Sequence, residues 1–286
     1  MKKKYTINDL SKYSPWPARL LGLEKFEQKH KTRKEVVREF EKEKWGALFD
    51  KILKQKRKLS INEVDEIHHG HSDILYYDHK HFKVGDAYNV HKKFLNFINK
   101  EIIPHISKSD NIVELGSGYG AVILELAKKL KNKKINFFAT EFTKSGLEII
   151  KKLSADEELN IVTGSCDITK NPITRIKIPE NSLIFTSSVA YIIPELKVDF
   201  IKNIAKLKPK IVIHIEPLYE DSIGNDLYSL LRKKYFKIND YNKNLLTILK
   251  KCERKKTIEI LGHKPTVFGS NPLFCCSVIK WKPKYK

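Results

Sequence analysis

Cysteine is scarce in this sequence. Its 286 residues include four cysteines, at irregular spacings: Cys166, Cys252, Cys275 and Cys276. That number and spacing argue against a disulfide framework and against a zinc site built on cysteine. We therefore expect a reducing, cytoplasmic setting.

Long apolar runs are also missing. No stretch approaches the ~20 apolar residues that a helix needs to cross a bilayer. The segment MKKKYTINDL at the start is not followed by the apolar stretch of a secretory signal. With 12 Gly and 11 Pro, the composition differs from that of collagen or a low-complexity chain, and 41% hydrophobic residues are enough for a buried core. We expect a globular protein without a membrane span.

Arginine is rare although the chain is strongly basic. There are 55 basic and 34 acidic residues, for a formal net charge of +21, yet only seven of the basic residues are Arg. Planar, bidentate recognition of phosphate favours Arg. The lysines are scattered along the chain, alternating with Glu and apolar residues as on the wet face of helices. Nucleic acid is a possible partner on these grounds but not the favoured one.

The first part of the chain has mostly helical signals. Thr32 to Glu35 and Ser60 to Glu63 each fit a capping box, with apolar residues at helical spacing behind them. A further helix is expected to end near Pro104. We expect residues 1–104 to form a helical N-terminal extension that acts as a lid or substrate cap, and residues 105–286 to form the main domain.

In the main domain, short apolar runs alternate with amphipathic segments. The runs are 111–115, 135–140, 160–164, 183–187 and 211–215, and helix-like stretches at 121–130, 146–153 and 195–207 lie among them. A final strand is expected at 274–279. Regular alternation of strand and helix predicts an α/β fold, a mostly parallel sheet that is doubly wound, with helices on both faces. Ligands bind such sheets beyond the carboxyl ends of the strands.

A glycine-rich turn follows the first of these strands. Glu114 is followed by Gly116, Gly118 and Gly120, so the backbone can turn tightly and approach a ligand without a Cβ in the way. With Ala121 as the last small residue, the segment also fits the dinucleotide pattern G-x-G-x-x-G/A. However, Glu114 would repel a pyrophosphate and attract a ligand that carries an ammonium group.

The region from about residue 110 to 280 resembles the class I S-adenosylmethionine-dependent methyltransferases, whose glycine motif is E-x-G-x-G-x-G. The resemblance implies a Rossmann-like fold with a seven-stranded sheet, and S-adenosylmethionine as cofactor. It also implies that Glu141 grips the ribose hydroxyls and that Asp167 faces the adenine amino group. The cofactor-binding residues implied in this way are Glu114, Gly116, Ser117, Gly118, Gly120, Glu141, Phe142, Asp167 and Ser187.

The catalytic candidates follow the fourth and fifth strands. Tyr191 lies in the segment that forms one edge of the active site in the family. The family's commoner motifs are absent there, so the sequence does not indicate which atom of the acceptor is methylated. His214 and Glu216 share one face near the end of the fifth strand, and Glu216 is the better candidate for a general base because it is nearer that end. His214 could equally be a core residue.

Two polar and aromatic segments are candidates for contact with the substrate. Asp240, Tyr241 and Asn242 lie in a turn that recognises substrate or is a plain loop. Tyr76 and Tyr77, together with one of the nearby histidines, cover the cofactor pocket, line the acceptor site or simply form a surface connector. The histidines in His68-His69-Gly70-His71 have irregular spacing and no accompanying Cys, so we expect no metal site.

The sequence therefore predicts a methyltransferase that acts on O or N of a small molecule or short peptide. Methylation of RNA or of a large protein is an alternative, and it predicts strongly salt-dependent binding to a polyanion. A non-catalytic binding protein with the same fold is a second alternative. An NAD(P) oxidoreductase is a third, and it requires the pyrophosphate to tolerate Glu114.

Overall fold

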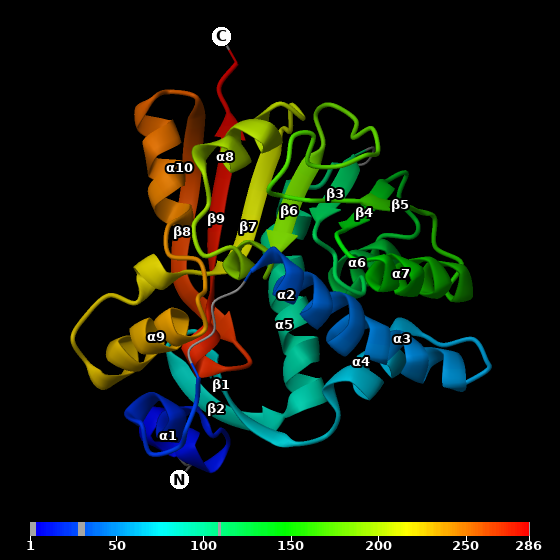
Figure 1. Ribbon diagram of the computed structural model, residues 1–286. Coiled ribbons are helices and arrows are strands. Elements are labelled where there is room, and N and C mark those ends of the chain that lie inside the picture. Colours follow the sequence, from blue (N-terminus) through cyan, green and yellow to red (C-terminus); the bar gives the residue numbers. More distant parts are fainter. Residues whose placement is uncertain (1–3, 28–31, 108–109, 286) are drawn as a thin grey trace.

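One sheet of nine strands forms the centre of the protein (Figure 1). The computed structural model describes residues 4–27, 32–107 and 110–285. The strand order is β2-β1-β8-β9-β7-β6-β3-β4-β5, with four neighbouring pairs parallel and four antiparallel. The strands are β1 (Asp73–Asp78), β2 (His81–Asp86), β3 (Asn111–Leu115), β4 (Asn136–Glu141), β5 (Ile161–Ser165), β6 (Leu183–Ser187), β7 (Ile211–Pro217), β8 (Ile258–Gly269) and β9 (Cys276–Pro283). The expected sheet of seven mostly parallel strands was wrong, because the sheet is larger and mixed.

The parallel half of the sheet lies where the sequence predicts it. Strands β3 to β7 coincide with the five apolar runs. β3 lies between β4 and β6, with Ile112 opposite Phe137 on β4 and Leu183 on β6. All five strands point the same way, so their carboxyl ends meet at one edge of the sheet.

The antiparallel half contains three strands that the sequence analysis missed. β1 and β2 form a hairpin within the part of the chain expected to be helical, and β1 pairs with β8. The hairpin turn uses His79 and Lys80 at φ of +46° and +72°, in place of the Asn and Gly that usually mark such turns. β8 contains Gly262 and Pro265, which weaken its strand signal.

Ten α-helices lie among the described residues. They are α1 (Trp16–Leu21), α2 (Arg33–Arg38), α3 (Trp45–Lys54), α4 (Ile61–His69), α5 (Ala87–Ile102), α6 (Ala121–Lys129), α7 (Lys144–Asp156), α8 (Val198–Ala205), α9 (Leu227–Ile238) and α10 (Leu245–Arg254). A π-helix, Glu39–Lys44, joins α2 to α3. Both expected capping boxes are present, at Thr32 and Ser60. No helix in the described ranges has the length and apolar character needed to cross a membrane.

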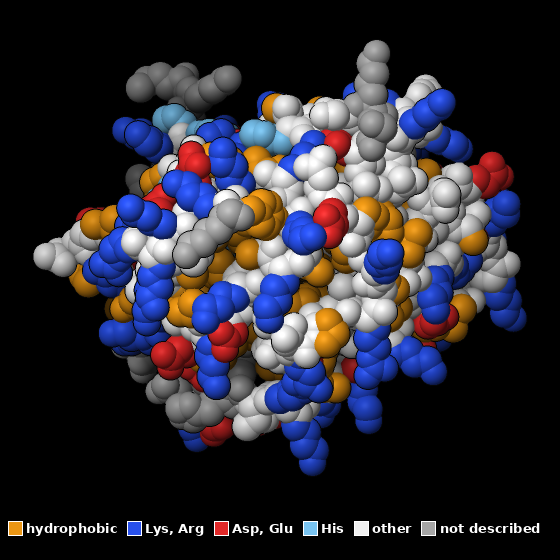
Figure 2. Space-filling model, turned by 90° about the horizontal axis from the view of Figure 1, so that it is seen from above, with side chains coloured by type: hydrophobic (Ala, Val, Ile, Leu, Met, Phe, Trp, Pro, Cys, Tyr) orange, Lys and Arg blue, Asp and Glu red, His pale blue; other side chains and the backbone are white. Residues whose placement is uncertain are grey.

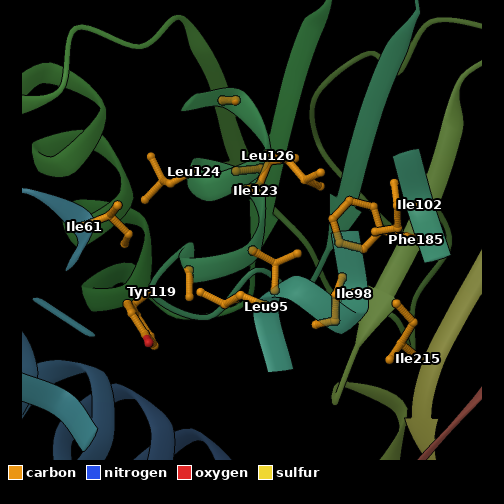
Figure 3. Close-up of a cluster of buried hydrophobic side chains, with 14 of the residues drawn as sticks. Ile61, Leu95, Ile98, Ile102, Tyr119, Ile123, Leu124, Leu126, Phe185 and Ile215 are labelled. Atoms are coloured by element: carbon orange, nitrogen blue, oxygen red, sulfur yellow. The ribbon is translucent and has the colours of Figure 1, made fainter. Parts of the chain in front are cut away.

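Helices cover both faces of the sheet, as expected for a doubly wound fold. On one face α5, α6 and α7 pack in a large apolar cluster, and on the other α8 and α10 pack in a second cluster. Figure 3 shows Leu95, Ile98 and Ile102 of α5 beside Phe185 and Ile215 of the sheet. This packing fixes the sheet edge from which the site is built.

Candidate functional site

A cavity of about 670 Å³ lies at the carboxyl ends of the parallel strands. Its volume is within the range of natural small-molecule sites. One wall is formed by the turn after β3 and by the ends of β4, β5 and β6, and the facing wall is formed by residues of α2 to α5. Figure 1 shows α2 beyond the carboxyl ends of β6 and β7.

The turn from β3 into α6, residues 116–120, lets neighbouring side chains pack closely on its backbone. We call it the glycine turn. Its glycines have left-handed φ values of +78°, +59° and +91° at Gly116, Gly118 and Gly120. The N–H groups of Gly116 and Ser117 both donate to the Thr140 carbonyl at 2.8 Å and tie the turn to β4. A Cβ on Gly116 would lie 2.6 Å from Cγ1 of Val189, so larger residues do not fit there.

Glu141, at the end of β4, lines the cavity beside the glycine turn. Its Oε2 accepts the Gly118 N–H at 3.0 Å, and its Oε1 accepts the N–H and the hydroxyl of Thr143 at 2.9 and 2.8 Å. Burial raises the pKa of this carboxyl, although these hydrogen bonds oppose the shift. Oε1 therefore already accepts two hydrogen bonds, whereas Oε2 can accept one more from a ligand.

Glu114 lines the cavity from β3 and is 1% exposed. Its Oε2 has no hydrogen-bond partner among the described residues. Burial raises the pKa of this carboxyl well above its ordinary value, because a charged group loses its water there. A cation held next to Oε2 would restore the ionised form.

Asp167 and Phe142 line the cavity after β5 and β4, and both contact Arg33 of α2. The Arg33 guanidinium forms an ion pair with Asp167, and its centre lies 5.3 Å from the centre of the Phe142 ring. Burial raises the pKa of Asp167, but hydrogen bonds from Thr169 and Arg33 outweigh burial and lower the pKa overall.

The segment 33–45, which we call the N-terminal cap, lies against the cavity and against α7. The carboxylate of Glu41 accepts the Lys144 and Ser145 N–H groups, at 2.7 and 3.1 Å, at the start of α7. A carboxylate is favoured at this position because the first N–H groups of a helix have no internal partner. Trp45 packs on the glycine turn, with its Cζ2 3.0 Å from where a Cβ on Gly118 would lie.

Solved structures with a similar fold were found by comparison. The [4+2]-cyclase SpnF has a TM-score of 0.56 at 9% identity, covering 92% of this chain and 100% of its own. A mutant form of MtNAS has a TM-score of 0.50 at 9% identity, covering 88% of this chain and 75% of its own. A geranyl diphosphate methyltransferase in complex with GPP and sinefungin has a TM-score of 0.49 at 9% identity, over 83% and 98% of the two chains.

The chain has a class I methyltransferase fold. No protein-family model matches the sequence, and no curated protein does. At such low identity the likeness extends to the fold alone. SpnF is named as a cyclase, so likeness in fold does not decide the reaction, which has to be argued from the site.

The expected cofactor residues of this methyltransferase fold lie together, with one exception. Glu114, Gly116, Ser117, Gly118, Glu141, Phe142, Asp167 and Ser187 line the cavity. Gly120 does not. It caps α6 in a left-handed conformation, and a Cβ there would lie 2.8 Å from Cγ1 of Ile150.

Of the three expected catalytic residues, one lines the cavity and two do not. Tyr191 lines the cavity, whereas His214 and Glu216 do not. His214 is fully buried; its Nδ1 lies 2.9 Å from the Thr186 hydroxyl and its ring stacks near Trp281. Burial lowers the pKa of His214 to about 3. The prediction that His214 acts at the cleft is therefore corrected, and the core position that the sequence left open is the one observed.

Glu216 supports the cavity wall from behind. Its carboxylate accepts the N–H of Val189 at 2.9 and 3.0 Å and that of Ala190 at 3.1 Å. It is 1% exposed, and burial raises its pKa to about 7. A general base must reach the substrate, so the geometry makes Glu216 a positioning residue for the 188–191 segment instead of a base.

The expected substrate residues do not line the cavity. Tyr76 accepts a hydrogen bond from Lys93 at 2.9 Å, and Tyr77 stacks on Tyr228 with ring centres 5.6 Å apart. The three residues of the second segment, Asp240, Tyr241 and Asn242, lie behind Tyr191 and its neighbours. Asn242 donates to the Ile193 carbonyl at 2.8 Å, the Tyr241 ring lies 5.0 Å from that of Tyr191, and Asp240 forms an ion pair with Lys243. Neither segment lines the cavity, which favours the alternatives in which they are a connector and a plain loop.

Sequence reasoning missed a polar cluster on the facing wall, which we call the histidine cluster. It consists of Asp65, His68, His69, His91 and Tyr119, and all except Asp65 line the cavity. His68 and His69 belong to the group from which one histidine was expected at the cofactor pocket or the acceptor site, but the sequence did not indicate which one. His91 gave no signal, because in the sequence it is one polar residue of an amphipathic helix. No group of three or more His, Cys, Asp or Glu in the described ranges is arranged to hold a metal ion.

Proposed function

We propose that this protein is an S-adenosylmethionine-dependent methyltransferase that acts on O or N of a small molecule or short peptide. The observation that carries the proposal is the placement of three carboxylates, Glu114, Glu141 and Asp167, at the ends of adjacent strands around the cavity beside the glycine turn. A pyrophosphate would meet repulsion from these groups. A ligand with an ammonium group, ribose hydroxyls and an adenine amino group would find an acceptor for each.

The chain's own residues fit such a cofactor. The unpartnered Oε2 of Glu114 would receive the ammonium group, which would keep this buried carboxylate ionised. Oε2 of Glu141 would accept a ribose hydroxyl, and Asp167 with Phe142 would hold the adenine. Gly116 and Gly118 let Val189 and Trp45, which also line the cavity, pack directly on the glycine turn.

When bound, this cofactor supplies a sulfonium methyl group that is reactive without a covalent protein nucleophile. The protein has to hold the acceptor in line with the methyl group and exclude water, and orientation of this kind can contribute ~7–11 kcal/mol. The cavity walls suit both tasks because they include the apolar side chains of Val36, Phe40, Trp45 and Phe94. Tyr191 would contact the acceptor.

The N-terminal cap would close this site. Arg33 pairs with Asp167 across the cavity, and Glu41 fixes the segment to the start of α7. We therefore propose that residues 1–104, whose hairpin also extends the sheet, cap the domain formed by residues 105–286.

Surface charge favours a small acceptor over a polyanion. In the face shown in Figure 2, Lys and Arg side chains are spread widely instead of gathering into one band. Binding along a nucleic acid requires a basic stripe or patch. The cavity enclosed by the N-terminal cap also supports a small molecule or a short peptide.

Calorimetric titration of Glu141→Gln with S-adenosylhomocysteine, the demethylated cofactor, tests the proposal. The variant loses a charged acceptor for the ribose hydroxyls, so affinity should fall about 10- to 100-fold. Thr143→Ala is the matched control: it removes the hydroxyl that donates to Glu141 but lies outside the cavity lining. Affinity of Thr143→Ala should stay close to wild type. Equal affinity of Glu141→Gln and wild type would remove Glu141 from this role.

A further inference from the structure

The histidine cluster joins a fully buried carboxylate to a histidine on the cavity wall. Asp65, on α4, is 0% exposed. Its Oδ1 accepts the Tyr119 hydroxyl at 3.0 Å and lies 3.4 Å from Nε2 of His91 on α5. Figure 3 shows the Tyr119 hydroxyl directed away from the apolar cluster.

The charge of Asp65 is poorly compensated. Its Oδ2 accepts no hydrogen bond in the described part of the chain, and the nearest cation is the Lys92 ammonium at 3.8 Å. A buried anion of this kind favours a positive charge next to it. Protonation of His91 would supply that charge on a side chain that lines the cavity.

Burial keeps the other two histidines neutral at neutral pH. The single hydroxyl proton of Tyr119 goes to Asp65, so in its 3.3 Å contact with Nε2 of His69 the Tyr119 oxygen accepts and His69 donates. Burial, together with the neighbouring histidines, lowers the pKa of His69 to about 2, and burial lowers that of His68 to about 4. His69 stacks on His91 with ring centres 3.8 Å apart and adds no competing charge at neutral pH.

Apolar and aromatic side chains flank the histidine cluster on this wall. Phe94 and Leu95 are three and four residues further along α5, so they share its helix face, and both line the cavity. Trp45 and Tyr119 lie beyond His68, with ring centres 5.6 and 5.1 Å from that imidazole. An acceptor that reached His91 would therefore be held mainly by apolar and aromatic contacts.

We propose that Asp65 and His91 form the general-base pair of the acceptor site, and that the acceptor is an apolar small molecule methylated on a hydroxyl group. This inference rests on the proposed function and makes it more specific. A neutral amine attacks without losing a proton first, whereas a hydroxyl becomes a good nucleophile only as its proton leaves. A buried carboxylate–histidine pair would therefore assist methylation of a hydroxyl acceptor by taking up its proton.

The proposed step balances without any further reactant. The hydroxyl oxygen forms a bond to the methyl carbon while the carbon–sulfur bond breaks, and the electron pair of that bond stays on sulfur. The hydroxyl proton passes to the imidazole of His91, where the resulting positive charge is stabilised by Asp65. Release of the methyl ether and loss of this proton to water restore the site.

The test uses 4-nitrophenol, an aromatic hydroxyl compound whose ionised form absorbs visible light. It is titrated with protein saturated with S-adenosylhomocysteine, at a pH at which the free phenol is mostly neutral. Proton transfer to His91 should raise the ratio of ionised to neutral phenol at least about 10-fold on binding. His91→Gln should abolish this rise and Asp65→Asn should reduce it. His81→Gln, an exposed residue at the start of β2, should behave as wild type.

Each outcome decides the matter. Saturable binding without an ionised band, or the same band in His91→Gln, would overturn the base pair. Absence of saturable binding to wild type would overturn the acceptor class. Calorimetry with S-adenosylhomocysteine separates this result from failure of the proposed function: affinity should be retained in both variants, and loss of binding in the wild type would reject the cofactor assignment itself. If His91→Gln fails to bind S-adenosylhomocysteine, Asp65→Asn carries the test.

Discussion

Gly116→Ala is expected to destabilise the protein for two reasons. The backbone at Gly116 has a conformation that disfavours residues with a Cβ, and neighbouring atoms occupy the place of that Cβ. Gly116 has a φ of +78°, and an added Cβ would lie 2.6 and 2.7 Å from the two γ-methyl groups of Val189. Val189 cannot easily retreat, because its N–H is held by both carboxylate oxygens of Glu216. The substitution therefore acts on two restraints at once.

The expected magnitude is the sum of these two effects. A residue with a Cβ in the left-handed region costs about 1–2 kcal/mol, and an extra methyl group in a packed site costs about 1–3 kcal/mol. We expect Gly116→Ala to lower the free energy of unfolding by about 2–5 kcal/mol. Adding Val189→Ala should relieve the packing part and leave the conformational part, so the pair should show a coupling of about 1–3 kcal/mol in a double-mutant cycle.

Urea unfolding of the four proteins of this cycle gives the measurement. Gly262→Ala is the control: it lies in β8, a Cβ there would meet nothing within 4 Å, and its φ is outside the left-handed region. Its stability should stay within about 0.5 kcal/mol of wild type. A Gly116→Ala variant as stable as this control, or a cycle without coupling, would refute the described packing of the glycine turn.

Two further predictions concern Glu216 and Glu41. Glu216 has a pKa of about 7 in the folded protein, above its ordinary value of 4.5, so the folded state binds the Glu216 proton more tightly than the unfolded state does. The stability that this proton contributes, about 2–4 kcal/mol, is lost as pH rises from about 4.5 to 7. Urea unfolding across this range should show a smaller decline for Glu216→Gln than for wild type, and parallel curves would contradict the shift. Glu41→Ala removes the carboxylate that accepts two backbone N–H groups at the start of α7 and should cost about 1–2 kcal/mol in thermal unfolding. Glu43→Ala, which loses only an exposed ion pair with Arg38, should cost less than about 0.5 kcal/mol, and equal losses would remove the capping role.

Local patterns in the sequence were sufficient to predict the parallel half of the fold. The run at 111–115 and the glycines after it have one physical explanation, a buried strand followed by a turn without side chains, and the structure has both. The hairpin at 73–86 escaped because His79 and Lys80 take left-handed conformations that favour other residues. The two strands that the turn joins pair with each other, and β1 also pairs with β8, which sequence spacing does not reveal.

The site was predictable only where the chain itself brings residues together. Glu114 and the glycine turn are adjacent in sequence, and Glu141 and Asp167 follow neighbouring strands, so the fold class was enough to place them. Asp65 and His91 meet through the packing of α4 on α5, for which the sequence has no local marker. The positioning role of Glu216 depends on backbone N–H groups of another loop, which are likewise absent from any side-chain pattern.

The most direct test of the account is calorimetric titration of the wild-type protein with S-adenosylhomocysteine and, separately, with NAD. Three carboxylates around one cavity should bind S-adenosylhomocysteine, with about one ligand per chain, and should reject NAD, whose pyrophosphate they repel. Binding of S-adenosylhomocysteine without binding of NAD is the predicted result. Tight binding of NAD, or no binding of S-adenosylhomocysteine, would contradict it.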